Sequence, residues 1–91
     1  MRYNSFLAIC AVMIVASCGN RTVVENTGPD ELLKLRSGPG LGFNIIMGLP
    51  DGTELDLREC VTEVGQRWCE VSLADAPRIT GYVSADYLSG Q

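Results

Sequence analysis

The segment from residue 53 to residue 73 constrains the fold most, because it has the pattern of two β-strands that fold back on each other. On its first arm, Leu55 and Leu57 alternate with charged side chains, as in a half-buried strand. The second arm alternates in the same way, with apolar side chains at Cys69, Val71 and Leu73. Between the arms lies a short polar segment with Gly65, which can adopt a positive φ. The segment therefore predicts a β-hairpin with a cysteine on each arm.

The register of this hairpin depends on the length of its turn. A two-residue turn at Val64 and Gly65 places Cys60 opposite Cys69 in a non-hydrogen-bonded pair. The Cα atoms of such a pair lie about 4.5 Å apart, and this distance makes a disulfide feasible. The same register makes three further pairs: Glu63 with Gln66, Thr62 with Arg67, and Val61 with Trp68. A three-residue turn with Gly65 as its left-handed residue is the alternative, and it shifts the register by one.

Strict alternation from Leu57 would point Cys60 away from the core. If Cys60 joins Cys69 on the core side, one strand needs an extra residue, so we predict a β-bulge near Arg58 and Glu59.

The two hairpin cysteines could hold a metal, act as a redox pair or form a structural bridge. A zinc site needs four ligands, and the chain has no histidine to complete one. Redox pairs are usually spaced by two residues, whereas eight residues separate Cys60 from Cys69. A structural disulfide formed in an oxidising compartment is the favoured interpretation, and we expect no bound metal.

Length and charge limit the function further. The 91 residues allow one small domain, and the net charge of −4 leaves no basic stripe for nucleic acid. The absence of histidine removes the commonest general base. A domain this small has little room for a cleft flanked by two catalytic carboxylates, and no segment has the dense aspartates of a calcium loop. We therefore expect no nucleic-acid partner, no cofactor and no catalysis.

The N-terminal region has the features of a secretion signal. The apolar run over residues 6–16 is too short to span a bilayer, which takes about 20 residues. It ends in Val-Ala-Ser-Cys, residues 15–18, which resembles the signal box of bacterial lipoproteins, where cleavage precedes a cysteine that is then acylated. The resemblance implies a signal peptide over residues 1–17 and lipid, such as palmitate, on Cys18. An ordinary signal peptide with a coincidental cysteine is the alternative.

The lipidated tether would cover residues 18–21 and lead into a domain over residues 22–91. In Gram-negative lipoproteins, an aspartate after the acylated cysteine tends to retain the protein at the inner membrane. Because Gly19 holds that position, we expect a lipid-anchored protein that faces the periplasm from the outer membrane.

The rest of the chain reads as short strands between glycine- and proline-rich turns. The hairpin is flanked by four further strand candidates, at residues 22–25, 32–36, 45–47 and 79–83. Five or six short strands with no helical period predict an all-β domain, either a small barrel or a sandwich.

Four blocks of this chain resemble the bacterial SH3-like (SH3b) domains, in the order and spacing of that family: residues 33–40, 48–53, 68–71 and 81–88. The resemblance covers about residues 23–90 and implies a small SH3-like barrel. Many relatives have tryptophan where this chain has Tyr82. A subset of secreted relatives carries a cysteine pair on this hairpin, as here.

The glycine-dense loop over residues 37–42 superficially suggests a phosphate cradle, but no helix follows it. The resemblance implies instead that this loop, with Gly38, Pro39 and Gly40, lines a ligand groove.

Four aromatic residues are candidates for the same groove. Trp68 and Tyr82 lie out of phase with the inward-facing residues of their strands, so we expect their rings at the surface, where a peptide or glycan could stack. Phe43 and Tyr87 are expected to be core or half-core residues. The alternative for each ring is that it only caps the edge of the barrel.

The resemblance implies a non-catalytic module that recognises cell-wall material, with peptidoglycan stem peptides as the expected ligand. Relatives that cleave the wall carry their catalytic cysteine and histidine in a separate domain. The alternative function is an adaptor whose aromatic face docks a periplasmic or outer-membrane protein.

Overall fold

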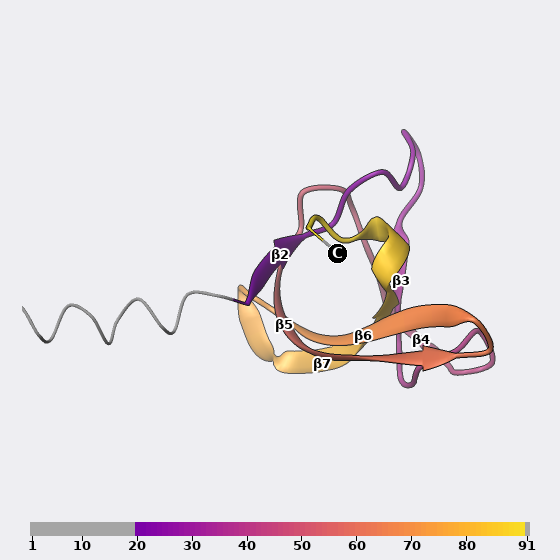
Figure 1. Cartoon of the computed structure of the whole chain (residues 1–91). Coiled ribbons are helices and arrows are strands. Elements are labelled where there is room, and N and C mark those ends of the chain that lie inside the picture. Colours follow the sequence, from indigo (N-terminus) through magenta and orange to yellow (C-terminus); the bar gives the residue numbers. More distant parts are fainter. Residues whose placement is uncertain (1–19, 91) are drawn as a thin grey trace, which may run out of the picture.

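The computed structural model describes residues 20–90 and forms one antiparallel sheet that curls into an SH3-like half-barrel (Figure 1). The elements follow the chain as β2 (Arg21–Val23), β3 (Leu33–Arg36), β4 (Ile45–Leu49), β5 (Glu54–Glu63), β6 (Gln66–Leu73), β7 (Ala76–Ser84) and the 3₁₀ turn η1 (Ala85–Tyr87). The strands are ordered β2-β5-β6-β7-β3-β4 in the sheet. The predicted all-β fold of five or six short strands is confirmed.

The core lies inside the curl and draws side chains from nearly every element. Its buried members are Val24, Leu33, Leu35, Leu49, Leu55, Cys69, Val71, Val83, Ala85 and Leu88. An isolated bridge between Val24 and Leu88 brings the two ends of the domain together. On β3 and β6 the core residues are two apart, Leu33 with Leu35 and Cys69 with Val71, so the alternation in the sequence accounts for the burial on these strands.

The β5–β6 hairpin has the register that the two-residue turn predicts. Cys60 pairs with Cys69, Val61 with Trp68, and Glu63 with Gln66. The register shifts between Leu57 and Cys60, which confirms the bulge at residues 58–59. The two cysteines are joined in a disulfide, with their Cα atoms 3.9 Å apart. Leu57 and Cys60 both pack on the core from this strand, and the bulge makes that arrangement compatible with the pleat.

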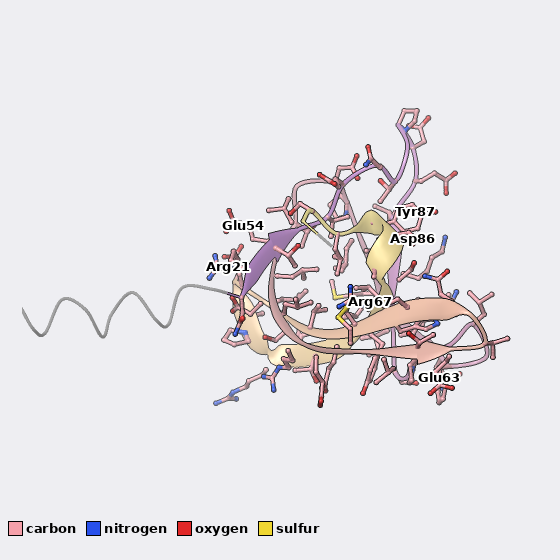
Figure 2. The ribbon with its side chains drawn as sticks, in the orientation of Figure 1. Arg21, Glu54, Glu63, Arg67, Asp86 and Tyr87 are labelled. Carbon is pink, nitrogen blue, oxygen red and sulfur yellow. A yellow bond between two sulfur atoms is a disulfide. The ribbon has the colours of Figure 1, made fainter. Side chains whose placement is uncertain are left out.

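The two edge strands differ in chemistry. At the β2 edge, the Arg21 guanidinium donates to Asp56 at 2.8 Å and to Glu54 at 3.2 Å, and so fastens β2 to β5 (Figure 2). The hydrogen bond to Asp56, followed by the attraction of its charge, raises the pKa of Arg21. The β4 edge is apolar instead, and Ile45 and Ile46 are exposed there. The sequence predicted a strand at this place but did not predict its exposure.

The predicted signal peptide, with Cys10, and the predicted lipidation site Cys18 lie outside the residues that the structure describes. Within residues 20–90, no helix has the length and apolar character needed to cross a membrane.

Candidate ligand-binding groove

The floor of the groove is the face of the hairpin that points away from the core. Trp68 pairs with Val61 on one side and with Ser84 of β7 on the other, and cross-strand partners point to the same face. The second pair toward the turn, Glu63 and Gln66, therefore lies on this face as well, because the pair between them, Thr62 and Arg67, points to the opposite face. The Gln66 side-chain amide donates to the Ser84 hydroxyl at 3.0 Å and ties the two strands together.

One wall of the groove is the loop over residues 37–44. Arg36 shapes this loop, because its guanidinium donates to the carbonyl oxygens of Leu41 and Phe43, both at 3.1 Å. The Phe43 ring lies against Gly38, where a Cβ would come within 2.5 Å of the ring atoms. Gly38 thus makes room for Phe43 inside the loop, while the neighbouring Pro39 and Gly40 face the groove.

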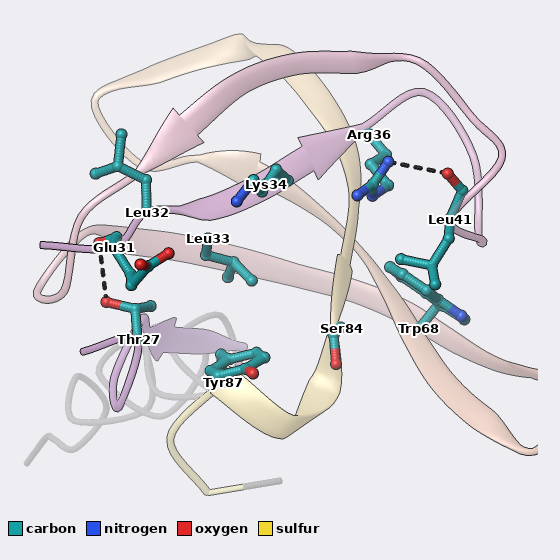
Figure 3. Close-up of a pocket in the computed structure, with 10 residues that line it drawn as sticks. All are labelled: Thr27, Glu31, Leu32, Leu33, Lys34, Arg36, Leu41, Trp68, Ser84 and Tyr87. Carbon is teal, nitrogen blue, oxygen red and sulfur yellow. Dashed lines mark hydrogen bonds between the residues drawn. The ribbon is translucent and has the colours of Figure 1, made fainter.

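The opposite wall is η1 together with the loop before β3. The Ser84 hydroxyl accepts a hydrogen bond from the backbone N–H of Asp86 and caps the 3₁₀ turn, which holds Asp86 and Tyr87 at the rim. Farther along, the Thr27 hydroxyl donates to the Glu31 carbonyl at 3.2 Å, and this bond closes the loop before β3 (Figure 3).

Two adjoining hollows lie between these walls. The aromatic hollow, of about 490 Å³, is lined by Pro39, Gly40, Leu41, Glu63, Val64, Gln66, Trp68, Ser84, Asp86 and Tyr87. The charged hollow, of about 200 Å³, is lined by Thr27, Glu31, Leu32, Leu33, Lys34, Arg36, Leu41, Trp68, Ser84 and Tyr87. Because four residues line both hollows, the two form one continuous groove. Its combined size is that of sites that hold small ligands.

The structure corrects three expectations about aromatic residues. Trp68 does lie on the outward face, but it is only 5% exposed, because the loop of residues 37–44 folds over it and Leu41 points toward its ring (Figure 3). Phe43 and Tyr87 were expected in or near the core, yet they are 47% and 37% exposed. Burial of these side chains is decided by segments distant in the chain, which strand alternation does not reveal.

The predicted site residues separate into two groups. Pro39, Gly40, Trp68 and Tyr87 come together around the aromatic hollow. Gly38, Phe43 and Tyr82 line neither hollow, although Gly38 and Phe43 support the loop that does.

Several groove residues were not among those predicted from the sequence. They are Glu31, Lys34, Arg36, Leu41, Glu63, Val64, Gln66, Ser84 and Asp86. The hairpin register already places Glu63 on the face of Trp68, so that residue could have been found. Gln66, the partner of Glu63, could have been found in the same way. Lys34 and Arg36 lie on β3 and Ser84 ends β7, and the remaining residues come from loops, turns and η1. Their place around the groove depends on how the sheet folds.

The groove provides an apolar surface and charged side chains with which a ligand can make contact. Over residues 20–90, no group of three or more cysteine, aspartate or glutamate side chains is arranged to hold a metal ion. What the arrangement provides is an apolar, partly aromatic channel with charged side chains at its rim, which suits an extended ligand.

Comparison with known proteins gives two results. The profile of the bacterial SH3 domain matches residues 31–89. A protein of Bacillus subtilis (strain 168), YrvJ, which is named as an N-acetylmuramoyl-L-alanine amidase, is 32% identical over 74 residues. That match takes in 81% of this chain but only 12% of YrvJ. No solved structure matches significantly. The six-stranded curled sheet and the profile match agree, and the chain belongs to the bacterial SH3 domain family.

Proposed function

We propose that this protein is a non-catalytic module that binds peptidoglycan in the groove between the loop of residues 37–44 and η1. The observation that carries the proposal is the mostly apolar hollow around Trp68, Tyr87 and Leu41, which has the volume of a ligand site. Support comes from the relative YrvJ, whose name refers to cleavage within peptidoglycan and of which this chain matches a small part.

The match does not imply that this chain has the amidase activity that the name of YrvJ refers to. The matched region is about one eighth of YrvJ, and the present chain has no histidine to act as a general base. We therefore propose binding without cleavage. Incubation of the protein with purified sacculi should release no soluble wall fragments.

The proposal includes an anchor and a location. Acylation at Cys18, after removal of residues 1–17, would hold the domain on a membrane in the cell envelope, and we propose the periplasmic face of the outer membrane. Each buried CH₂ group of an acyl chain contributes about 0.8 kcal/mol to membrane attachment. A short tether would keep the groove at high local concentration near the wall polymer.

Sedimentation with purified sacculi tests the binding. The protein from residue 19 onward is suitable, because its whole core lies between Val24 and Leu88. We expect it to sediment with sacculi, and we expect Leu41→Ala and Tyr87→Ala to weaken sedimentation about tenfold by removing apolar contact area from the groove. Ile79→Ala is the matched control, since Ile79 is an exposed apolar residue that lines neither hollow. Equal sedimentation of all three variants would argue against the groove.

A second candidate function is an adaptor for an envelope protein, and the β4 edge favours it. Ile45, Ile46 and Met47 are exposed on an edge strand that pairs only with β3 among the described strands. Such an edge can accept another strand. If sacculi do not retain the protein but one membrane protein does, and Ile45→Lys abolishes that retention, the adaptor function is supported.

A further inference from the structure

The charges of the groove are separated along its length. The aromatic hollow is lined by two carboxylates, Glu63 and Asp86, and by no cationic side chain. In the part of the chain that the structure describes, the two ion pairs both belong to Arg21, so neither groove carboxylate has one. Figure 2 shows Glu63 at the end of the hairpin and Asp86 beside Tyr87 on η1. An uncompensated negative rim therefore borders an apolar surface.

The nearest arginine in sequence does not neutralise this rim. Arg67 pairs with Thr62, and the side chains of this pair point to the same face as Cys69. Glu63 and Trp68 point to the other face. The two cations that do line the groove, Lys34 and Arg36, belong to the charged hollow, and Arg36 is already bonded to the carbonyls of Leu41 and Phe43.

We propose that the aromatic hollow is a subsite for a primary amine carried on an extended peptide, with Glu63 and Asp86 receiving the ammonium group and Trp68 and Tyr87 contacting its aliphatic stem. A lysine-like side chain has this composition, because an apolar stem of several carbons ends in a charged head. The inference rests on the proposed binding of peptidoglycan, whose stem peptides contain a diamino acid with a free amine wherever the peptide is not cross-linked.

The charged hollow then sets the direction of the ligand. A peptide whose amine lies between Glu63 and Asp86 extends past Leu41 toward Lys34, where a ligand carboxylate finds an opposite charge. Glu31 borders the same hollow and partly offsets that attraction. Ligands that carry an amine at one end and a carboxylate at the other fit this arrangement best, and the two ends cannot be exchanged.

The test compares sacculi whose free amines are intact with sacculi whose amines have been acetylated, which removes the positive charge. The protein from residue 19 onward and its variants Glu63→Gln and Asp86→Asn are sedimented with both preparations. Each substitution should weaken binding to intact sacculi about fivefold, and the two together about 20-fold, as expected for partly exposed ion pairs. Glu59→Gln, which removes an exposed carboxylate outside the groove, should bind as the unaltered protein does.

Acetylation should reduce binding of the unaltered protein to the level of the double variant and should leave the double variant unchanged. Equal binding to both kinds of sacculi, or equal loss in Glu59→Gln and Glu63→Gln, would overturn the amine subsite while leaving wall binding intact.

A second measurement separates the subsite from the proposed function. Trp68 is the only tryptophan of the chain and lies in the aromatic hollow, so its fluorescence reports on occupancy. Titration with the tripeptide Ala-Lys-Ala, acetylated at its N-terminus so that the lysine amine is its one primary amine, and with the Nε-acetyl form of the same peptide should show at least fivefold tighter binding of the free amine. Asp86→Asn should remove that preference. If this preference is found but sacculi are not bound, peptidoglycan is the wrong ligand and the amine subsite stands. If the two tripeptides bind equally, the subsite is wrong.

Discussion

Val64 combines a strained backbone with a fully exposed side chain at the end of the hairpin. Its φ is 49° and that of Gly65 is 77°, the left-handed pair that a two-residue turn requires between twisted strands. A β-branched residue is disfavoured there, because its side chain crowds the backbone. Val64 also lines the aromatic hollow. Its side chain therefore adds apolar surface to the groove although it destabilises the turn.

Val64→Asn should therefore stabilise the domain, because asparagine tolerates the left-handed conformation. We expect a gain of about 1 kcal/mol, which raises Tm by roughly 4–8 °C in a domain of this size. Thermal unfolding followed by circular dichroism measures the shift. Gly65→Ala, the change in the opposite direction at the next position, should lower Tm. A lower Tm for Val64→Asn would mean that the valine is not strained.

At the scale of elements, the hairpin could be predicted from the sequence in detail. The alternation of Leu55, Leu57, Cys69 and Val71 defined both arms, and the need to bring Cys60 to the core side located the bulge. These features depend on residues that are close together in the hairpin. The pairing of the two strands and the alternation of side chains between their faces determine the register and the bulge.

The walls of the groove could not be predicted in the same way. The burial of Trp68 depends on a loop that is distant from it in the chain and that Arg36 holds through two backbone carbonyls. The exposure of Ile45 depends on the position of β4 at the edge of the sheet. Strand periodicity assigns a face to a residue but does not say what covers that face. Most residues of the candidate site could therefore be identified only from the folded structure.

The disulfide between Cys60 and Cys69 should contribute much of the stability of this small domain. It closes a loop of about ten residues, and the chain-entropy relation gives roughly 2.5–3 kcal/mol for such a loop. Replacing both cysteines with alanine should lower the free energy of unfolding by about that amount, as measured by urea denaturation. Reduction of the unaltered protein is the control and should give a similar loss. An unchanged urea midpoint in both experiments would show that the bridge adds nothing to the hydrophobic core.

At the scale of the whole molecule, the chain enters the sheet at β2, on the side opposite the turn of the β5–β6 hairpin (Figure 1). The aromatic hollow includes Glu63 and Val64 of that turn end. A tether attached before β2 would therefore leave this end of the groove pointing away from the attachment point. For a domain anchored on a membrane, that orientation presents the amine subsite toward the wall.

This orientation requires the proposed anchor, which substitution at Cys18 tests. Cys18→Ala removes the sulfur that carries the lipid, so the protein should lose its membrane attachment or accumulate as an uncleaved precursor. Cell fractionation and intact mass measurement distinguish these outcomes from a mature, acylated protein. Cys10→Ala is the matched control, because it removes a cysteine inside the predicted signal peptide and should leave anchoring unchanged. If Cys18→Ala stays on the membrane at the mature mass without lipid, another part of the chain holds it there, and the groove need not face the wall.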